Sequence, residues 1–191
     1  TLTLLGLPIA GGGAYLLSMG QFAAGGMVLL LSGALDLLDG AVARATDRVT
    51  RFGAFLDSNV DRVSEAVVLL GLLVYYLGRP STTETAVGAV LVYVAIVSSI
   101  MVSYSRARAE GLGIECNVGL MTRPERIAVL SIGLIAGQWW RPAVLIALGL
   151  VAVLATVTTM QRVLHARGRL AMTETPVSAI EQLDIDEPAS G

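Results

Sequence analysis

The chain has 191 residues, of which 54% are hydrophobic and only 15% are charged, and its mean hydropathy is +0.73. These values lie outside the range of soluble domains, so we expect an all-α integral membrane protein. A single cysteine, Cys116, excludes an internal disulfide framework and a metal site built from several thiolates. All 13 basic residues are arginine, which is the better bidentate phosphate ligand.

Apolar runs in chain order predict six membrane-spanning helices in one bundle. The first is interrupted by Pro8, which a membrane helix with packed neighbours tolerates. A tight turn follows near Gly20, and Trp139 and Trp140 are typical of an interfacial belt between the last two spans. The predicted spans are residues 2–18, 22–45, 53–78, 84–109, 124–140 and 142–166. One domain, residues 1–166, therefore accounts for the whole ordered chain.

The ends of the chain carry two further expectations. The first apolar run starts directly after Thr1 with no charged region before it, so we expect the sequence to lack its native N-terminus. Residues 167–191 are predicted to form a disordered C-terminal tail, because this segment becomes acidic and contains Pro and Ser.

The distribution of arginines predicts the orientation in the cell membrane. Arginines cluster in the link between spans two and three, around the link between spans four and five, and at the C-terminus. Only Arg79 and Arg141 fall on the opposite side. By the positive-inside rule the arginine-rich side is cytoplasmic, and with six spans both termini are cytoplasmic as well.

Four aspartates interrupt the second and third spans: Asp36, Asp39, Asp57 and Asp61. Each Asp near a bilayer centre costs about 2.5–3.5 kcal/mol, so such residues normally face a polar cavity and mark function. The first pair is spaced by three residues and the second by four, so each pair shares one helix face. Two facing helices would bring the four carboxylates together. Ligands that are all oxygen suit Mg²⁺, Mn²⁺ or Ca²⁺ rather than zinc.

The same stretch forms the pattern D-x2-D-G-x2-A-R-x8-G-x3-D-x3-D, whose fixed positions are Asp36, Asp39, Gly40, Ala43, Arg44, Gly53, Asp57 and Asp61. This pattern resembles the signature of the CDP-alcohol phosphotransferases. The resemblance implies an enzyme of phospholipid biosynthesis that transfers a phosphatidyl group from CDP-diacylglycerol to an acceptor hydroxyl and releases CMP. It also implies a homodimer in the membrane with a cytoplasmic-facing polar cavity. We expect no nucleic-acid partner.

Within this resemblance the aspartates have assigned roles. Asp36, Asp39 and Asp57 are implied as ligands of two Mg²⁺ or Mn²⁺ ions. Asp61 is implied both as a ligand near the second ion and as the general base on the acceptor hydroxyl. It lies one turn from Asp57 on the same face, so it reaches a nucleophile held beside the metals.

The remaining signature positions are implied to bind the CDP-lipid. Gly40, Ala43 and Gly53 would admit the nucleotide, while Arg44 and Thr50 would contact its ribose or phosphates. Direct ligand contact and a packing role are equally compatible with Gly40 and Gly53.

A second set of segments points to the acceptor. Residues 107–110 (ARAE) and 123–126 (RPER) resemble the corresponding segments of phosphatidylinositol-phosphate and archaetidylinositol-phosphate synthases. The resemblance implies that Arg106, Arg126 and Arg162 bind the phosphate of inositol 1-phosphate. The alternative is that these arginines only satisfy the positive-inside rule.

Other interpretations of the function remain open at this point. The same chemistry with glycerol 3-phosphate as acceptor would give phosphatidylglycerol phosphate. A divalent-cation transporter would also use intramembrane acids, but the outer halves of the spans lack polar residues to continue a pathway, and Arg44 would be unexplained. Glu65, one turn beyond Asp61, either orients an arginine, lines the acceptor cavity or is structural. The lipid tail, diacylglycerol or archaeal ether, also stays open.

Overall fold

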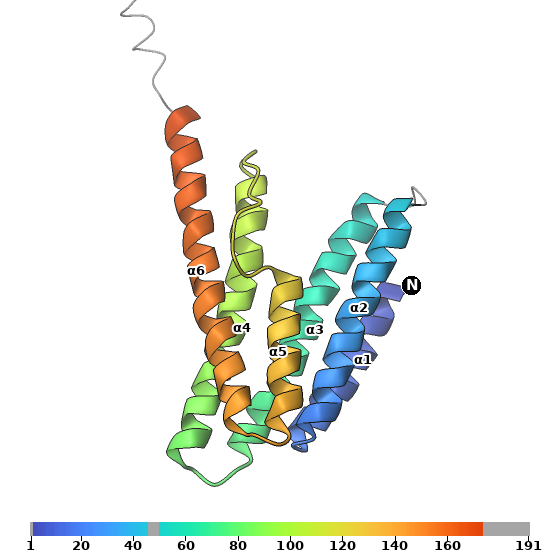
Figure 1. Cartoon of the computed structure of the whole chain (residues 1–191). Helices are drawn as coiled ribbons and strands as arrows, with labels where there is room; N and C mark the ends of the chain where they lie inside the picture. The colour runs from blue at the N-terminus through green and yellow to red at the C-terminus, as the bar shows by residue number, and fades with distance from the viewer. Residues whose placement is uncertain (1, 46–49, 174–191) are drawn as a thin grey trace, which may run out of the picture.

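The structure is a computed structural model that describes residues 2–45 and 50–173, with the side chains of residues 6–37 and 50–172. Within this part of the chain every regular element is an α-helix (Figure 1). The helices are α1 (Leu2–Ser18), α2 (Phe22–Ala45), α3 (Arg51–Leu77), α4 (Thr83–Glu110), α5 (Arg123–Gly137) and α6 (Pro142–Thr173). The predicted all-α architecture is confirmed, and the tight turn after α1 is made by Gly20 at φ 79°.

The predicted start of the C-terminal tail was wrong. We expected disorder from residue 167 onward, but α6 continues through Thr173. Arginine, leucine, alanine and methionine are strong helix formers and dominate residues 166–172, so the helix extends past the apolar span into polar sequence. Residues 174–191, the rest of the predicted tail, lie outside the described residues.

The helices run alternately up and down, which places particular chain segments at each end of the bundle. The ends of α2, α4 and α6 and the start of α3 share one end, the upper end in Figure 1, and α5 starts below this end and runs downward from it. Arg106 and Arg123 belong to this arginine-rich end. Arg79 and Arg141 flank the helices at the opposite end. The charge segregation expected from the sequence is therefore present in three dimensions.

The interior forms where the helices pack against one another, and aliphatic side chains fill it. α1 packs on α3, α2 on α5 and α4 on α6. Leu17, Leu72, Leu134 and Leu148 are fully buried between them. These side chains pack against one another and fill the space between the helices.

Apolar side chains also cover the outside of the bundle, for example Leu31, Val90 and Ile132. Among the described residues, Thr83–Glu110 and Pro142–Met172 are long and apolar enough to cross a membrane by length and composition, and Phe22–Leu37 is a shorter apolar helix. Lipid is the solvent that suits such an outer surface.

Close approach of α1 to α3 depends on Gly71. A Cβ atom there would lie 2.3 Å from the carbonyl oxygen of Ala14, a backbone atom that cannot move aside alone. Gly71→Ala should lower the free energy of unfolding by about 1–3 kcal/mol, because the two helices must separate. Denaturant unfolding of the purified protein measures the loss. Gly149→Ala is the matched control, since a Cβ atom at Gly149 would meet nothing within 4 Å; equal stabilities of the two variants would contradict the close contact.

Candidate active site

Two rows of charged side chains meet between α3 and α5 near the arginine-rich end. Asp61 and Glu65 are one turn apart on α3, and Arg123 and Arg126 are one turn apart on α5. Arg123 Nη1 lies 2.8 Å from Asp61 Oδ2. Arg126 donates from Nε and Nη2 to the two oxygens of Glu65, each at 2.8 Å. The matched spacings thus produce two ion pairs, one above the other.

Arg123 also contacts a third helix. Its Nη2 donates to Asp36 Oδ2 on α2 at 2.8 Å. One guanidinium therefore bridges two aspartates of the signature, one from α2 and one from α3. The sequence analysis treated Arg123 as a cytoplasmic charge and as part of the RPER segment, and it did not predict this contact with the aspartates. No local spacing in the sequence could have identified this contact, because Asp36 and Arg123 are 87 positions apart.

The other two aspartates of the signature, Asp57 and Asp39, are not seen in contact with Asp36 and Asp61 among the described side chains. Asp57, one turn before Asp61, is exposed, and the side chain of Asp39 lies outside the described residues. Within the described part of the chain, no three Asp, Glu, His or Cys side chains lie close enough to hold a metal ion. The donors that are described do suit a hard cation, because Asp36 and Asp61 present carboxylate oxygens to the same positive group.

The structure describes only some of the residues predicted to bind the CDP-lipid. The side chains of Ala43 and Arg44, and the surroundings of Gly40, lie outside the described residues. Thr50 is the N-cap of α3, and its hydroxyl accepts a hydrogen bond from the Gly53 backbone N–H at 3.0 Å. A Cβ at Gly53 would lie 2.8 Å from that hydroxyl oxygen. The absence of a side chain at Gly53 thus permits the cap, which is the packing role considered from the sequence.

A cavity of about 170 Å³ opens beside Asp61 at the arginine-rich end. All three arginines predicted to bind the acceptor phosphate line it, together with Arg123. With Arg62 of α3, they bring positive charge from four helices to a cavity that the carboxylates of Asp61 and Glu65 also line. The lining arginines are Arg62, Arg106, Arg123, Arg126 and Arg162.

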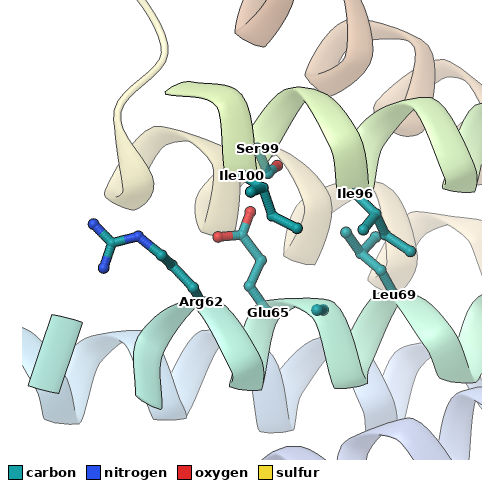
Figure 2. Close-up of a pocket in the computed structure, with 7 residues that line it drawn as sticks. Arg62, Glu65, Leu69, Ile96, Ser99 and Ile100 are labelled. Carbon is teal, nitrogen blue, oxygen red and sulfur yellow. The ribbon is translucent and has the colours of Figure 1, made fainter. Parts of the chain in front are cut away.

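Glu65 orients one of these arginines. It binds Arg126 bidentately, and the Arg126 side chain is only 3% exposed. Figure 2 shows the Glu65 carboxylate pointing away from α3 toward Ser99 and Ile100 of α4, while Arg62 extends away from it. Glu65 also lines the cavity itself, so two of the roles considered from the sequence apply together.

The other two predicted acceptor arginines differ in how firmly they are held. Arg162 is buried, and it donates from Nε to the Val118 carbonyl oxygen at 2.9 Å and from Nη1 to the Val102 carbonyl oxygen. Arg106 is exposed and pairs with Glu110 in the next turn, at 2.7 Å. A firmly held arginine and a weakly held one therefore face the same space.

The chain matches the CDP-alcohol phosphatidyltransferase family over residues 1–167. It belongs to this family. Archaetidylinositol phosphate synthase of Methanothermobacter thermautotrophicus is 39% identical over 173 residues, which cover 88% of this phosphatidyltransferase and 83% of the relative. Phosphatidylinositol phosphate synthase of Mycobacterium tuberculosis is 36% identical over 165 residues, covering 84% and 75%. The predicted family and enzyme class are confirmed.

Solved structures agree with this phosphatidyltransferase in fold. The crystal structure of M. tuberculosis phosphatidylinositol phosphate synthase (PgsA1) with CDP-DAG bound has a TM-score of 0.76 and 33% identity, and the match covers 86% of this chain and 83% of that one. A structure of the same protein with manganese and citrate has a TM-score of 0.77 and 33% identity, with coverage of 86% and 79%. Together with the apolar helices, these relatives confirm that the phosphatidyltransferase is a membrane protein.

Proposed function

We propose that this phosphatidyltransferase transfers the phosphatidyl group of a CDP-linked lipid, CDP-diacylglycerol or its ether counterpart, to a hydroxyl of inositol 1-phosphate and releases CMP. The observation that carries the proposal is the cavity where Asp61 lies beside several arginines. A carboxylate next to concentrated positive charge suits an alcohol that carries a phosphate. Relatives named as archaetidylinositol and phosphatidylinositol phosphate synthases support the choice of acceptor.

In this proposal Asp61 acts on the acceptor hydroxyl. Its carboxylate accepts the hydroxyl proton while the hydroxyl oxygen bonds to the lipid-side phosphorus. The bond from that phosphorus to the bridging oxygen breaks, and CMP leaves with the electron pair. Asp36, Asp39 and Asp57, with Asp61, would hold two Mg²⁺ or Mn²⁺ ions. When bound, the ions neutralise phosphate oxygens and stabilise the attacking and leaving groups.

The arginines position the acceptor in this scheme. Arg126 is fixed by Glu65, and Arg162 is fixed by two backbone carbonyls, so both present N–H groups without a large loss of side-chain freedom. Arg106 is free to leave Glu110 for a stronger phosphate contact. The phosphate would thus be held at the arginines while the sugar hydroxyl reaches Asp61.

Replacing the acceptor arginines tests the choice of substrate. Arg106→Ala, Arg126→Ala and Arg162→Ala should each raise the KM for inositol 1-phosphate by about tenfold or more, since each loses a charge-assisted hydrogen bond. The KM for CDP-diacylglycerol should change little. Kinetics of CMP release with purified protein measure both constants.

Arg108→Ala is the control for these variants, because Arg108 is exposed on the same helix as Arg106 and lies outside the 170 Å³ cavity. We expect it to leave both KM values unchanged. Faster turnover with glycerol 3-phosphate, and the same dependence on the arginines, would assign the alternative acceptor. If all three variants kept the parent KM, the arginines would serve topology alone.

The proposed topology has all six helices crossing the membrane, with the arginine-rich end and both termini in the cytoplasm. The segregation of arginines between the two ends of the bundle supports it. Cysteines introduced at Ser81, between α3 and α4, and at Asn117, between α4 and α5, occupy exposed positions at opposite ends. In intact cells an impermeant maleimide should label only Ser81→Cys, and after permeabilisation it should label both. Labelling of Asn117→Cys alone in intact cells would indicate the opposite orientation.

The homodimer implied by the family resemblance stays a prediction.

A further inference from the structure

Arg123 lies between the carboxylates of Asp36 and Asp61, two of the proposed metal ligands, and its positive charge balances their negative charges. Its two terminal nitrogens contact Asp36 Oδ2 and Asp61 Oδ2 at the same distance, 2.8 Å. The Arg123 and Asp61 side chains are 27% and 19% exposed, so solvent screens this contact only in part. Without a cation, two such carboxylates on α2 and α3 would repel each other.

The third nitrogen of Arg123 is not satisfied in this position. Among the described residues, Arg123 Nε is buried and has no hydrogen-bond partner. Arg126, one turn away, differs because its Nε and Nη2 both bind Glu65. A buried donor without a partner costs free energy. Arg123 is therefore held by its two aspartates rather than by a complete structural site, and it is the more easily displaced of the two arginines.

We propose that Arg123 competes with a divalent ion for Asp36 and Asp61, and that an ion binding these two aspartates displaces the guanidinium. Until an ion binds, its guanidinium holds the two carboxylates together and keeps the ligands in place. When the ion arrives, the same oxygens cannot serve both cations at close range, because the two positive charges repel. Arg123 is thus a positioning residue for the ligands. The inference rests on the proposed metal site.

Displacement also changes the neighbouring cavity. Arg123 already lines the cavity that holds Arg106, Arg126 and Arg162. A guanidinium released from the aspartates adds its charge to that arginine cluster. Loading of the metal site would therefore prepare the acceptor site for a phosphate, and both events would depend on one side chain.

Mn²⁺ titration of the purified protein tests the proposal without substrate or turnover. Arg123→Gln removes the competing cation, so it should bind Mn²⁺ about tenfold more tightly than the parent protein in isothermal titration calorimetry. Arg123→Lys keeps one charge but loses the fork that spans two carboxylates, so its affinity should fall between the two. Arg108→Gln is the control for loss of a positive charge, because Arg108 is exposed on α4 and lies outside the cavity that Asp61 and Arg123 line. It should change the affinity by less than about threefold.

Thermal unfolding supplies a second measurement that separates displacement from simple structural support. In EDTA, Arg123→Gln and Arg123→Lys should both melt below the parent protein, and saturating Mn²⁺ should raise their Tm by more than it raises the parent Tm. Unchanged or weaker Mn²⁺ binding by Arg123→Gln, or equal Mn²⁺-induced shifts in all three proteins, would overturn the inference. Failure of the parent protein to bind Mn²⁺ would instead overturn the proposed metal site, and this inference with it.

Discussion

Asp57→Asn and Asp36→Asn should each reduce CMP release by at least about a thousandfold, because a metal site contributes several kcal/mol to the transition state and about 1.4 kcal/mol corresponds to tenfold in rate. Asparagine keeps the shape of the side chain but removes the charge that holds a divalent ion. Asp57 is exposed, so its replacement should leave folding intact. Release of CMP from CDP-diacylglycerol in the presence of inositol 1-phosphate is the assay. Mn²⁺ titration should reveal weakened binding in both variants.

The two variants differ in their effect on Arg123. Asp36→Asn also removes one of the two partners of Arg123, whereas Asp57→Asn leaves that contact in place. Glu84→Gln is a control for loss of an acid, since Glu84 is exposed in the first turn of α4 at the opposite end of the bundle. It should retain full activity. Parent-level activity in Asp57→Asn or Asp36→Asn would refute the assignment of that residue as a metal ligand.

Asp61→Asn should lower kcat by about 10² to 10⁴, the range expected for loss of a general base in the chemical step. The KM for CDP-diacylglycerol should change by less than about threefold, because the base acts on the acceptor rather than on the nucleotide. Steady-state kinetics at saturating inositol 1-phosphate separate the two constants. If only the KM for the CDP-lipid changed, Asp61 would be a binding residue.

A second comparison separates the two roles proposed for Asp61. Asp61→Glu keeps a carboxylate but moves it by one methylene, so partial activity is expected if proton transfer tolerates the shift. Mn²⁺ affinity should fall less in Asp61→Asn than in Asp57→Asn if proton transfer is the main role of Asp61. An equal loss of Mn²⁺ affinity in the two variants would make Asp61 chiefly a ligand.

Much of the fold follows from local patterns in the sequence. Apolar runs broken by Gly20, by the Arg79–Pro80 step and by Pro142 delimit helices, because hydrophobic length and chain-breaking residues act within one segment. Four carboxylates at helical spacing mark the candidate site, since charged groups within an apolar segment need a functional reason. The end of α6 was misplaced because the loss of hydrophobicity after residue 166 ends a membrane span but does not end a helix.

The sequence by itself determined the membrane class and the order of the helices in the described part of the chain, because these depend on composition and short-range spacing. Its signature indicated the family, and the four aspartates of that signature remain the proposed metal site. Only the tertiary structure decided how the arginines are distributed among partners. Asp36 and Arg123 are 87 positions apart, and Glu65 and Arg126 are 61 positions apart. No local pattern specifies which acid meets which base over such distances. The packing of α2 against α5 and the reach of the arginine side chains make that choice, because ion pairs form only where the folded backbone brings opposite charges within a few ångströms.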